Sequence, residues 1–246
     1  MIRRVFGELP ALCRQDVYGT RTAGYYDTYG TEQNDVAFYA QETDGRTTAV
    51  LSDAFSHGAL SVTDDADLAE LSAFIRFLGL QTLLCNRKTA NRLQFASSEH
   101  GSVMRYYGTE QNERVVPVGV NDPAFSFRDV YALLTKCGFA LGGYDAWFGD
   151  FALRVRRHTA DVQSVYRDSV LASTASVLFQ SGGKAYLGAV ATDPAFRGQG
   201  LAGTLVLSLT KGGKRAEILC KAHRVSFYEQ LGFQQIGEFS ICHFSK

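Results

Sequence analysis

The pattern of apolar and polar positions is clearest in the second half of the chain. An uninterrupted apolar run at 185–191 predicts a buried strand, which the turn-forming residues 192–194 end. After a glycine-containing turn at 197–200, apolar side chains recur at helical spacing through 201–209. A helix that begins among small residues presents unpaired N–H groups and the positive end of its dipole. The sequence therefore predicts a strand, a turn and a helix that together form an anion site.

The remainder of the second half alternates between helical and strand-like patterns. Ser126 is expected to cap a helix that ends at Gly138, and the aromatic and branched residues of 144–155 predict a strand. Further strands are predicted at 162–166, 170–179, 216–220 and 239–244, with a turn at 181–183 and a short helix at 226–231. Because a helix joins 187–191 to 216–220, these two strands should be parallel, and 239–244 should close the sheet.

The first half contains a similar order of elements. A helix and a loop are expected up to Arg21, and Asp67 is expected to cap the clearest helix of this half, which stops at Gly79. Strands are predicted at 35–41, 47–52, 58–62 and 81–85, the first two joined by a turn at Asp44-Gly45.

Proline and turn residues near position 120 suggest how the chain is divided. Pro117 and Asn121-Asp122-Pro123 separate the two patterns, so the predicted domains are 1–120 and 121–246. The segment Tyr-Gly-Thr-Glu-Gln-Asn occurs at 29–34 and again at 107–112. Both copies are polar and contain glycine, and exposed turns are the favoured interpretation over a paired ligand site.

Charge is distributed unevenly although the net charge is zero. Of the 25 basic and 25 acidic residues, 12 and 6 lie in 151–246, which leaves 13 and 19 for 1–150. The basic part suits a polyanionic ligand, whereas the acidic part could attract a cationic substrate or the other half. No dense basic and aromatic strip is present, so the sequence predicts no nucleic-acid partner.

Length and cysteine usage exclude several classes of protein. The 246 residues contain no apolar stretch of membrane-spanning length, and Glu8 interrupts the start before a signal-peptide core develops, so no membrane partner and a cytoplasmic location are expected. The five cysteines are widely spread without a Cys-x-x-Cys pair, which favours neither a disulfide framework nor a metal site.

Two motifs narrow the chemistry. The first is Arg197-Gly198-Gln199-Gly200-Leu201-Ala202, and the second is Phe227-Tyr228 followed by Gly232-Phe233. Together they resemble the GNAT superfamily of acetyl-CoA-dependent N-acyltransferases over residues 150–246. The resemblance implies an α/β (α+β) GNAT fold: a mixed, mostly antiparallel sheet with a splayed parallel strand pair and flanking helices, preceded by a smaller GNAT-like α/β domain.

The resemblance also implies a cofactor site for acetyl-CoA. The expected contacts come from the splayed strand and the loop after it: Val190, Ala191, Thr192, Arg197, Gly198, Gln199, Gly200, Leu201, Ala202 and Gly203. A main-chain N–H near Ala191 or Thr192 would bind the oxyanion. Many family members carry an asparagine where this chain has Lys221, which could reach a CoA phosphate instead.

Tyr228 is the expected general acid for the departing CoA thiolate. A phenol with a pKa of about 10 can donate to a thiolate of comparable basicity. The alternative is that Tyr228 packs its helix onto the sheet. For the general base the sequence leaves four candidates open: Asp150, His158, Asp168 and His223.

The resemblance thus implies an acetyl-CoA-dependent N-acetyltransferase that passes an acyl group directly to a small-molecule amine or a peptide. A homodimer is compatible with it. In the first half, Thr63-Asp64-Asp65-Ala66-Asp67 replaces the Gly-rich loop, and its carboxylates would repel a pyrophosphate. An unrelated substrate domain remains an alternative for this half. For the whole chain, the alternatives are a non-catalytic CoA sensor and an aminoacyl transferase that uses charged tRNA.

Overall fold

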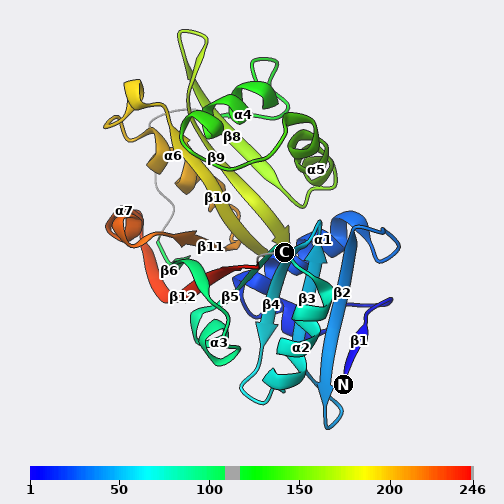
Figure 1. The fold of residues 1–246 in the computed structure, drawn as a ribbon. Coiled ribbons are helices and arrows are strands. Elements are labelled where there is room, and N and C mark those ends of the chain that lie inside the picture. Colours follow the sequence, from blue (N-terminus) through cyan, green and yellow to red (C-terminus); the bar gives the residue numbers. More distant parts are fainter. Residues whose placement is uncertain (109–116, 245–246) are drawn as a thin grey trace. The chain divides into compact units, whose positions relative to one another are not determined.

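The computed structural model describes residues 1–108 and 117–244, which form two compact units (Figure 1). The first unit comprises Met1–Met104, Leu219–Ser226 and Gln235–Lys246, and the second comprises Arg105–Ile218 and Phe227–Gln234. Both units therefore draw on residues from either side of position 120. No helix of the described residues is long and apolar enough to cross a membrane.

The first unit is a sheet with helices on both faces. Its strands lie in the order β1-β2-β3-β4-β5-β12-β6. In chain order the elements are β1 (Ile2–Arg4), η1 (Ala11–Arg14), α1 (Val17–Tyr29), β2 (Val36–Thr43), β3 (Arg46–Ala54), β4 (His57–Val62), α2 (Leu68–Leu78), β5 (Thr82–Asn86), α3 (Arg87–Arg92) and β6 (Ser97–Tyr106). On β3, Leu51 packs with Leu71 and Ile75 of α2, whereas Val50 packs with Ala23 of α1, so the alternation of the strand separates the two helices.

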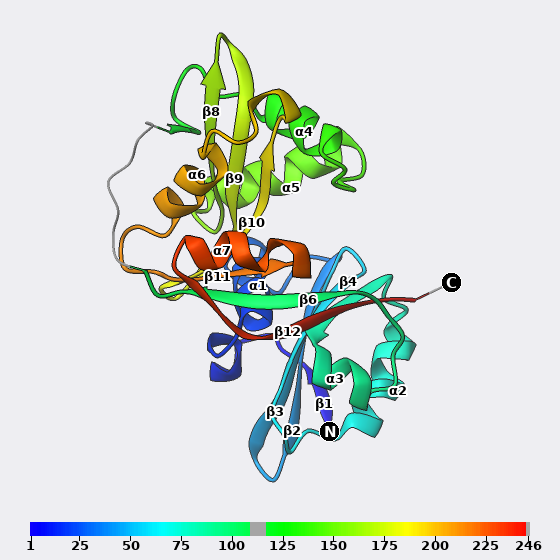
Figure 2. The same ribbon diagram turned by 90° about the vertical axis from the view of Figure 1, so that its left-hand side faces the viewer.

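The second unit has strand order β11-β10-β9-β8-β7, with helices on both faces of β8–β10 (Figure 2). Its elements, with those of the C-terminal segment, are β7 (Val118–Gly119), α4 (Phe127–Lys136), α5 (Tyr144–Arg156), β8 (Asp161–Arg167), β9 (Val170–Ser181), β10 (Lys184–Thr192), η2 (Pro194–Phe196), α6 (Leu201–Leu209), β11 (Arg215–Cys220), η3 (Ala222–Arg224), α7 (Val225–Gln230) and β12 (Phe233–His243). Val130, Leu134 and Phe151 of α4 and α5 pack on one face of this sheet, and α6 covers the other face.

Each unit contains the same strand–helix–strand arrangement. In the first, α2 connects β4 to β5, which pair in parallel; in the second, α6 connects β10 to β11, which are also parallel. Antiparallel pairing joins β1 to β2, β2 to β3, β3 to β4, β8 to β9 and β9 to β10. The mixed, mostly antiparallel sheet with a parallel pair, predicted for this chain, is confirmed.

Residues 144–155 form helix α5, so the strand predicted there is wrong. The aromatic residues favoured a strand on propensity alone, but Tyr144, Trp147, Phe148 and Phe151 recur at helical spacing. Gly142, with φ of +71°, turns the chain just before the helix. The helical spacing of these aromatic residues therefore predicts their secondary structure better than their strand propensity does.

Two further expectations need correction. The first 21 residues contain a strand, a 3₁₀ turn and only the start of α1, which Asp16 caps, instead of a helix followed by a loop. The C-terminal strand pairs antiparallel with β5 of the first unit, from Phe239↔Asn86 to His243↔Thr82, whereas it was expected to close the sheet of the second half.

The repeated segment has its first copy at the end of α1. Tyr29 is the last residue of that helix, and the chain then leaves it through Gly30 and exposed polar residues. This agrees with the exposed turn predicted for it. Residues 109–112 of the second copy lie outside the described residues.

Candidate functional site

The turn between β10 and α6, residues 193–200, opens a helix through two glycines in a left-handed conformation. Gly198 and Gly200 have φ of +79° and +74°, and Gly200 is the N-cap of α6. No side chain of the described residues caps this helix. The first helical bond runs from Thr204 N–H to Gly200 O at 3.1 Å, so the N–H groups of residues 201–203 precede the ladder. The result is an exposed helix start that can accept an anion.

Open space surrounds both glycines. A Cβ built on Gly198 or on Gly200 would meet no atom of the described residues within 4 Å. A phosphate can therefore approach the main chain at this point without a steric conflict. Arg197, also exposed, donates from Nε to Thr192 O at 3.4 Å and so crosses the base of the turn.

Two of the predicted loop contacts have packing roles as well. Leu201 is buried, and Gly203 faces Leu231, whose Cδ2 lies 3.1 Å from the position of a Gly203 Cβ. These two residues can offer a ligand only their main-chain groups. Gly198, Gln199 and Gly200 are exposed, and Ala202 is partly buried.

Strand β10 bends where the predicted acyl arm would lie. Its antiparallel register with β9 shifts between Gly188 and Ala191, and Ala189 has φ of +49°, which is uncommon for a residue with a side chain. The parallel register with β11 ends at Leu187↔Ile218, while β10 continues to Thr192. The parallel pair therefore separates at this end, and among the described residues Ala189 and Val190 have no register partner on β9 or β11.

Of the three predicted strand residues, one lies inside that distortion and two follow it. Val190 lies inside the bulge and is partly buried. Ala191 and Thr192 have resumed pairing with β9, where Ser173 Oγ donates to Ala191 O at 3.0 Å and lies 2.9 Å from Thr192 Oγ1. Sequence reasoning missed Ala189, since alanine carries no preference for a positive φ.

Tyr228 is buried within an aromatic cluster of α7 and its neighbours. Its ring centroid lies 5.0 Å from that of Phe227 and 5.7 Å from that of Phe233, and Phe233 contacts Tyr106 at 5.2 Å. Only 6% of Tyr228 is exposed. Tyr228 therefore packs in the core of this cluster, and a role as general acid would come in addition to that packing.

The four candidate bases are not gathered around the turn by any contact within the described residues. Asp150 forms a bidentate ion pair with Arg154, which also stacks on Phe179, so Asp150 orients a buried guanidinium. His158 and Asp168 are exposed turn residues with φ of +57° and +49°.

His223 is exposed on η3, and Lys221 pairs with Glu99 at 3.4 Å. Among the described residues, no group of three or more His, Cys, Asp or Glu side chains could hold a metal ion.

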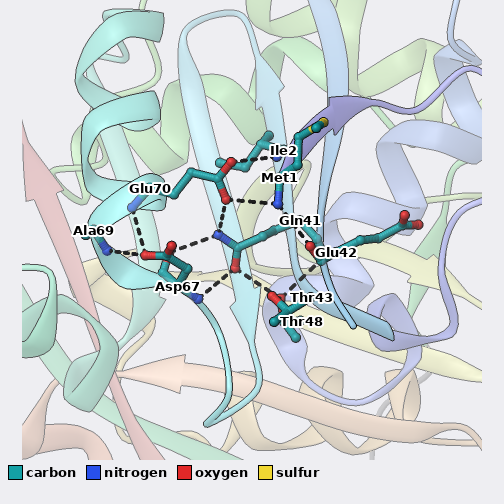
Figure 3. Close-up of polar contacts among 9 residues, drawn as sticks. All are labelled: Met1, Ile2, Gln41, Glu42, Thr43, Thr48, Asp67, Ala69 and Glu70. Atoms are coloured by element: carbon teal, nitrogen blue, oxygen red, sulfur yellow. Dashed lines mark hydrogen bonds and ion pairs between the residues drawn. The ribbon is translucent and has the colours of Figure 1, made fainter. Parts of the chain in front are cut away.

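The corresponding helix start of the first unit is organised differently. Asp67 caps α2, and its Oδ1 accepts from Ala69 N–H and Glu70 N–H, both at 3.0 Å (Figure 3). Gln41 is 1% exposed; its amide donates to Asp67 O and Glu70 Oε2 and accepts from Asp67 N–H and Thr48 Oγ1. Carboxylates of the chain itself therefore occupy the position that is open in α6.

Asp64 adds to this arrangement. It pairs with Lys88 at 3.2 Å and with Arg92 at 3.8 Å, both on α3. The acidic loop between β4 and α2 is thus engaged with its own helix and with α3, and a further anion at the start of α2 would meet the carboxylates of Asp67 and Glu70.

Comparison with known proteins finds a family model that matches part of the chain and solved structures that share its fold. Residues 162–235 match the family model described as an acetyltransferase (GNAT) domain. No curated protein sequence matches the chain. Among solved structures, a GCN5-related N-acetyltransferase from Kribbella flavida is similar, with 12% identity, 97% of each chain covered and a TM-score of 0.61.

Two further structures share the whole-chain fold. A GCN5-related N-acetyltransferase from Sphaerobacter thermophilus is 15% identical over 98% of this chain and 94% of its own, with a TM-score of 0.60. A tandem GNAT protein from the clavulanic acid biosynthesis pathway is 12% identical over 98% and 97%, with a TM-score of 0.59. The resemblance predicted from the two motifs is confirmed, and the fold of both units is that of a two-part GNAT protein.

Proposed function

We propose that this chain, whose residues 162–235 carry a GNAT acetyltransferase domain, moves an acetyl group from acetyl-CoA to an amine by direct transfer. The observation that carries the proposal is the uncapped, exposed start of α6 beside the bulge of β10. A pyrophosphate fits there because Gly198 and Gly200 leave the main chain open and the helix dipole favours negative charge. Acetyl-CoA would supply the activated acyl thioester.

The residues at the bulge and on α7 have separate roles in this proposal. Main-chain N–H groups of Ala189 and Val190, which lie where the register with β9 shifts, would donate to the oxygen that becomes negative as the amine attacks. Tyr228 would donate the proton that the sulfur leaving group takes up. The aromatic cluster around Tyr228 holds its ring in one orientation, which suits a fixed proton donor.

The alternative is a non-catalytic CoA sensor. One observation favours it: within the second unit, Asp150 is held by Arg154, and His158 and Asp168 are exposed turn residues that no described contact brings to the bulge. The enzymatic function requires no protein base if solvent removes the proton from the amine before the amine attacks. Binding alone does not distinguish the two functions.

Titration calorimetry with acetyl-CoA tests the binding step. Gly200→Glu and Arg197→Glu should abolish or strongly weaken binding, because each places negative charge beside the pyrophosphate. Gly212→Glu is the matched control, since Gly212 is also exposed with φ of +82° in an unrelated turn. Equal affinity of Gly200→Glu and Gly212→Glu would overturn the site.

Thiol release from acetyl-CoA, followed over a panel of amines, tests the chemical step. If Tyr228 is the acid, Tyr228→Phe should lower kcat while the Kd for acetyl-CoA stays within about twofold of the wild type. Acetyl-CoA binding without turnover on any amine, and without an effect of Tyr228→Phe, would favour the sensor.

A further inference from the structure

Lys136, in the last turn of α4, forms an ion pair with the first residue of the 193–200 turn. Its Nζ lies 2.6 Å from Asp193 Oδ2, across 57 positions of sequence. The lysine side chain is 58% exposed, whereas that of Asp193 is 11% exposed. A largely buried carboxylate at the entrance of an anion site is unfavourable for the anion unless a cation neutralises it.

Asp193 joins three neighbouring elements at this entrance. Its Oδ1 accepts from Ala195 N–H at 3.1 Å and so caps η2, and its own N–H donates to Ala172 O of β9 at 2.9 Å. Its carbonyl accepts from Phe196 N–H at 2.9 Å. The carboxylate therefore sets where the chain leaves β10 and enters the turn.

The end of α4 also contacts Thr192, the residue before Asp193. Cys137 Sγ donates to Thr192 O at 3.7 Å. Lys136 and Cys137 thus fasten two consecutive residues at the junction of β10 and the turn. Beyond that junction the turn is exposed, and Gly198 and Gly200 have the widest conformational freedom of any residue type. The position of the open N–H groups therefore depends on how the entrance is held.

We propose that Lys136 is a positioning residue for acetyl-CoA: through Asp193 it fixes the entrance of the 193–200 turn and neutralises the carboxylate that would otherwise repel the pyrophosphate. This inference rests on the proposed function of the same turn. The pKa of Asp193 agrees with it, because the hydrogen bond from Lys136 and then that from the Ala195 amide hold that pKa below its usual value. Asp193 is therefore charged at neutral pH, and its charge needs a partner.

The ion pair is more important for binding than for folding. The lysine end of the pair is 58% exposed and therefore screened by solvent, so removing Lys136 should lower the unfolding midpoint by no more than about 2–4 °C. The charge left on Asp193 acts on the cofactor instead. We expect Lys136→Met to raise the Kd and KM for acetyl-CoA by about tenfold, while kcat at saturation stays within about threefold.

Three further variants separate charge from position. Lys136→Arg retains the ion pair and should stay within about threefold of the wild-type Kd. Adding Asp193→Asn to Lys136→Met removes the unpaired charge and should recover part of the lost affinity. Lys88→Met is the matched control, because Lys88 is also an exposed lysine paired with one aspartate, Asp64.

Calorimetry with acetyl-CoA and steady-state kinetics on the full chain decide between the outcomes. A Lys136→Met chain that binds acetyl-CoA as tightly as Lys88→Met would overturn the inference and leave the proposed function intact. A fall in kcat at unchanged Kd would also overturn it, since Lys136 would then act in the chemical step. If the wild-type chain does not bind acetyl-CoA, the proposed function itself fails.

Discussion

Replacing Gly200 by alanine isolates the contribution of the open main chain at α6. The residue has φ of +74° and caps the helix without help from any side chain of the described residues. Alanine at a positive φ costs about 1 kcal/mol of folding free energy, and here no described atom within 4 Å adds a steric cost. The added methyl group would, however, occupy the space through which a phosphate reaches the N–H groups.

Gly212 provides the matched comparison. It has φ of +82°, is exposed, and its Cβ would also meet no described atom within 4 Å. Gly200→Ala and Gly212→Ala should therefore lose similar stability, about 1 kcal/mol each. A hydrogen bond to a charged group is worth roughly 1.5–3 kcal/mol, so displacing one N–H from the pyrophosphate should raise the Kd for acetyl-CoA by about ten- to a hundredfold.

Urea unfolding and calorimetry with acetyl-CoA measure the two quantities on the same preparations. The expected pattern is equal unfolding midpoints for the two variants and weaker acetyl-CoA binding by Gly200→Ala alone. Wild-type affinity in Gly200→Ala would refute the assignment of the turn to the pyrophosphate. A much larger loss of stability in Gly200→Ala than in Gly212→Ala would show that the binding defect comes from misfolding of the turn.

Three predictions concern stability. Gln41→Leu should lower the free energy of unfolding by about 2–4 kcal/mol, because the buried amide forms hydrogen bonds with Asp67, Glu70 and Thr48 that leucine cannot form. Urea unfolding measures the loss, and a change below about 1 kcal/mol would contradict the prediction. Glu217→Ala should cost about 2 kcal/mol in the same assay, since the carboxylate is 3% exposed and pairs with Arg105 at 2.8 Å and Arg215 at 2.9 Å; an unchanged midpoint would show that the pair contributes nothing. Burial, and then the charge of Arg21, lower the pKa of His57 below its usual 6.5, so below pH 6.5 the folded state binds fewer protons than the unfolded state. The contribution of His57 to stability should therefore be fully present above pH 6.5 and be lost as the pH falls below 6.5. His57→Gln should flatten this dependence in thermal melts between about pH 8 and pH 5.

Local signals explain why the turn and its helix could be predicted from the sequence. The apolar run of β10, the glycines of the turn and the spacing of Leu201, Leu205 and Leu209 all act within a few residues of one another. The caps of α2 and α4 were readable for the same reason, since Asp67 and Ser126 bond to N–H groups two or three residues away.

Features that depend on distant residues were missed. Strand β6 buries only Ser102, Val103 and Met104, so its pattern is too short to distinguish it from a loop. Its Gly101 lies so near Cys220 O that a Cβ would stand 2.2 Å from that oxygen, a constraint that residues 97–106 alone do not reveal. The same holds for the Lys136–Asp193 pair, whose partners become neighbours only when α4 packs beside the end of β10.

The difference between the two helix starts leads to a last prediction: the chain binds one acetyl-CoA. In α2 the N–H groups of Ala69 and Glu70 already bond to Asp67, and Glu70 adds a second carboxylate to the first turn. In α6 the corresponding groups have no cap among the described residues. Because an anion is stabilised only where donors are open and no like charge is near, calorimetry should give a stoichiometry of one. The sharper measurement uses Gly200→Glu, which should remove all binding. A stoichiometry of two, or residual binding of one acetyl-CoA by Gly200→Glu, would show that the first unit takes the cofactor despite its carboxylates.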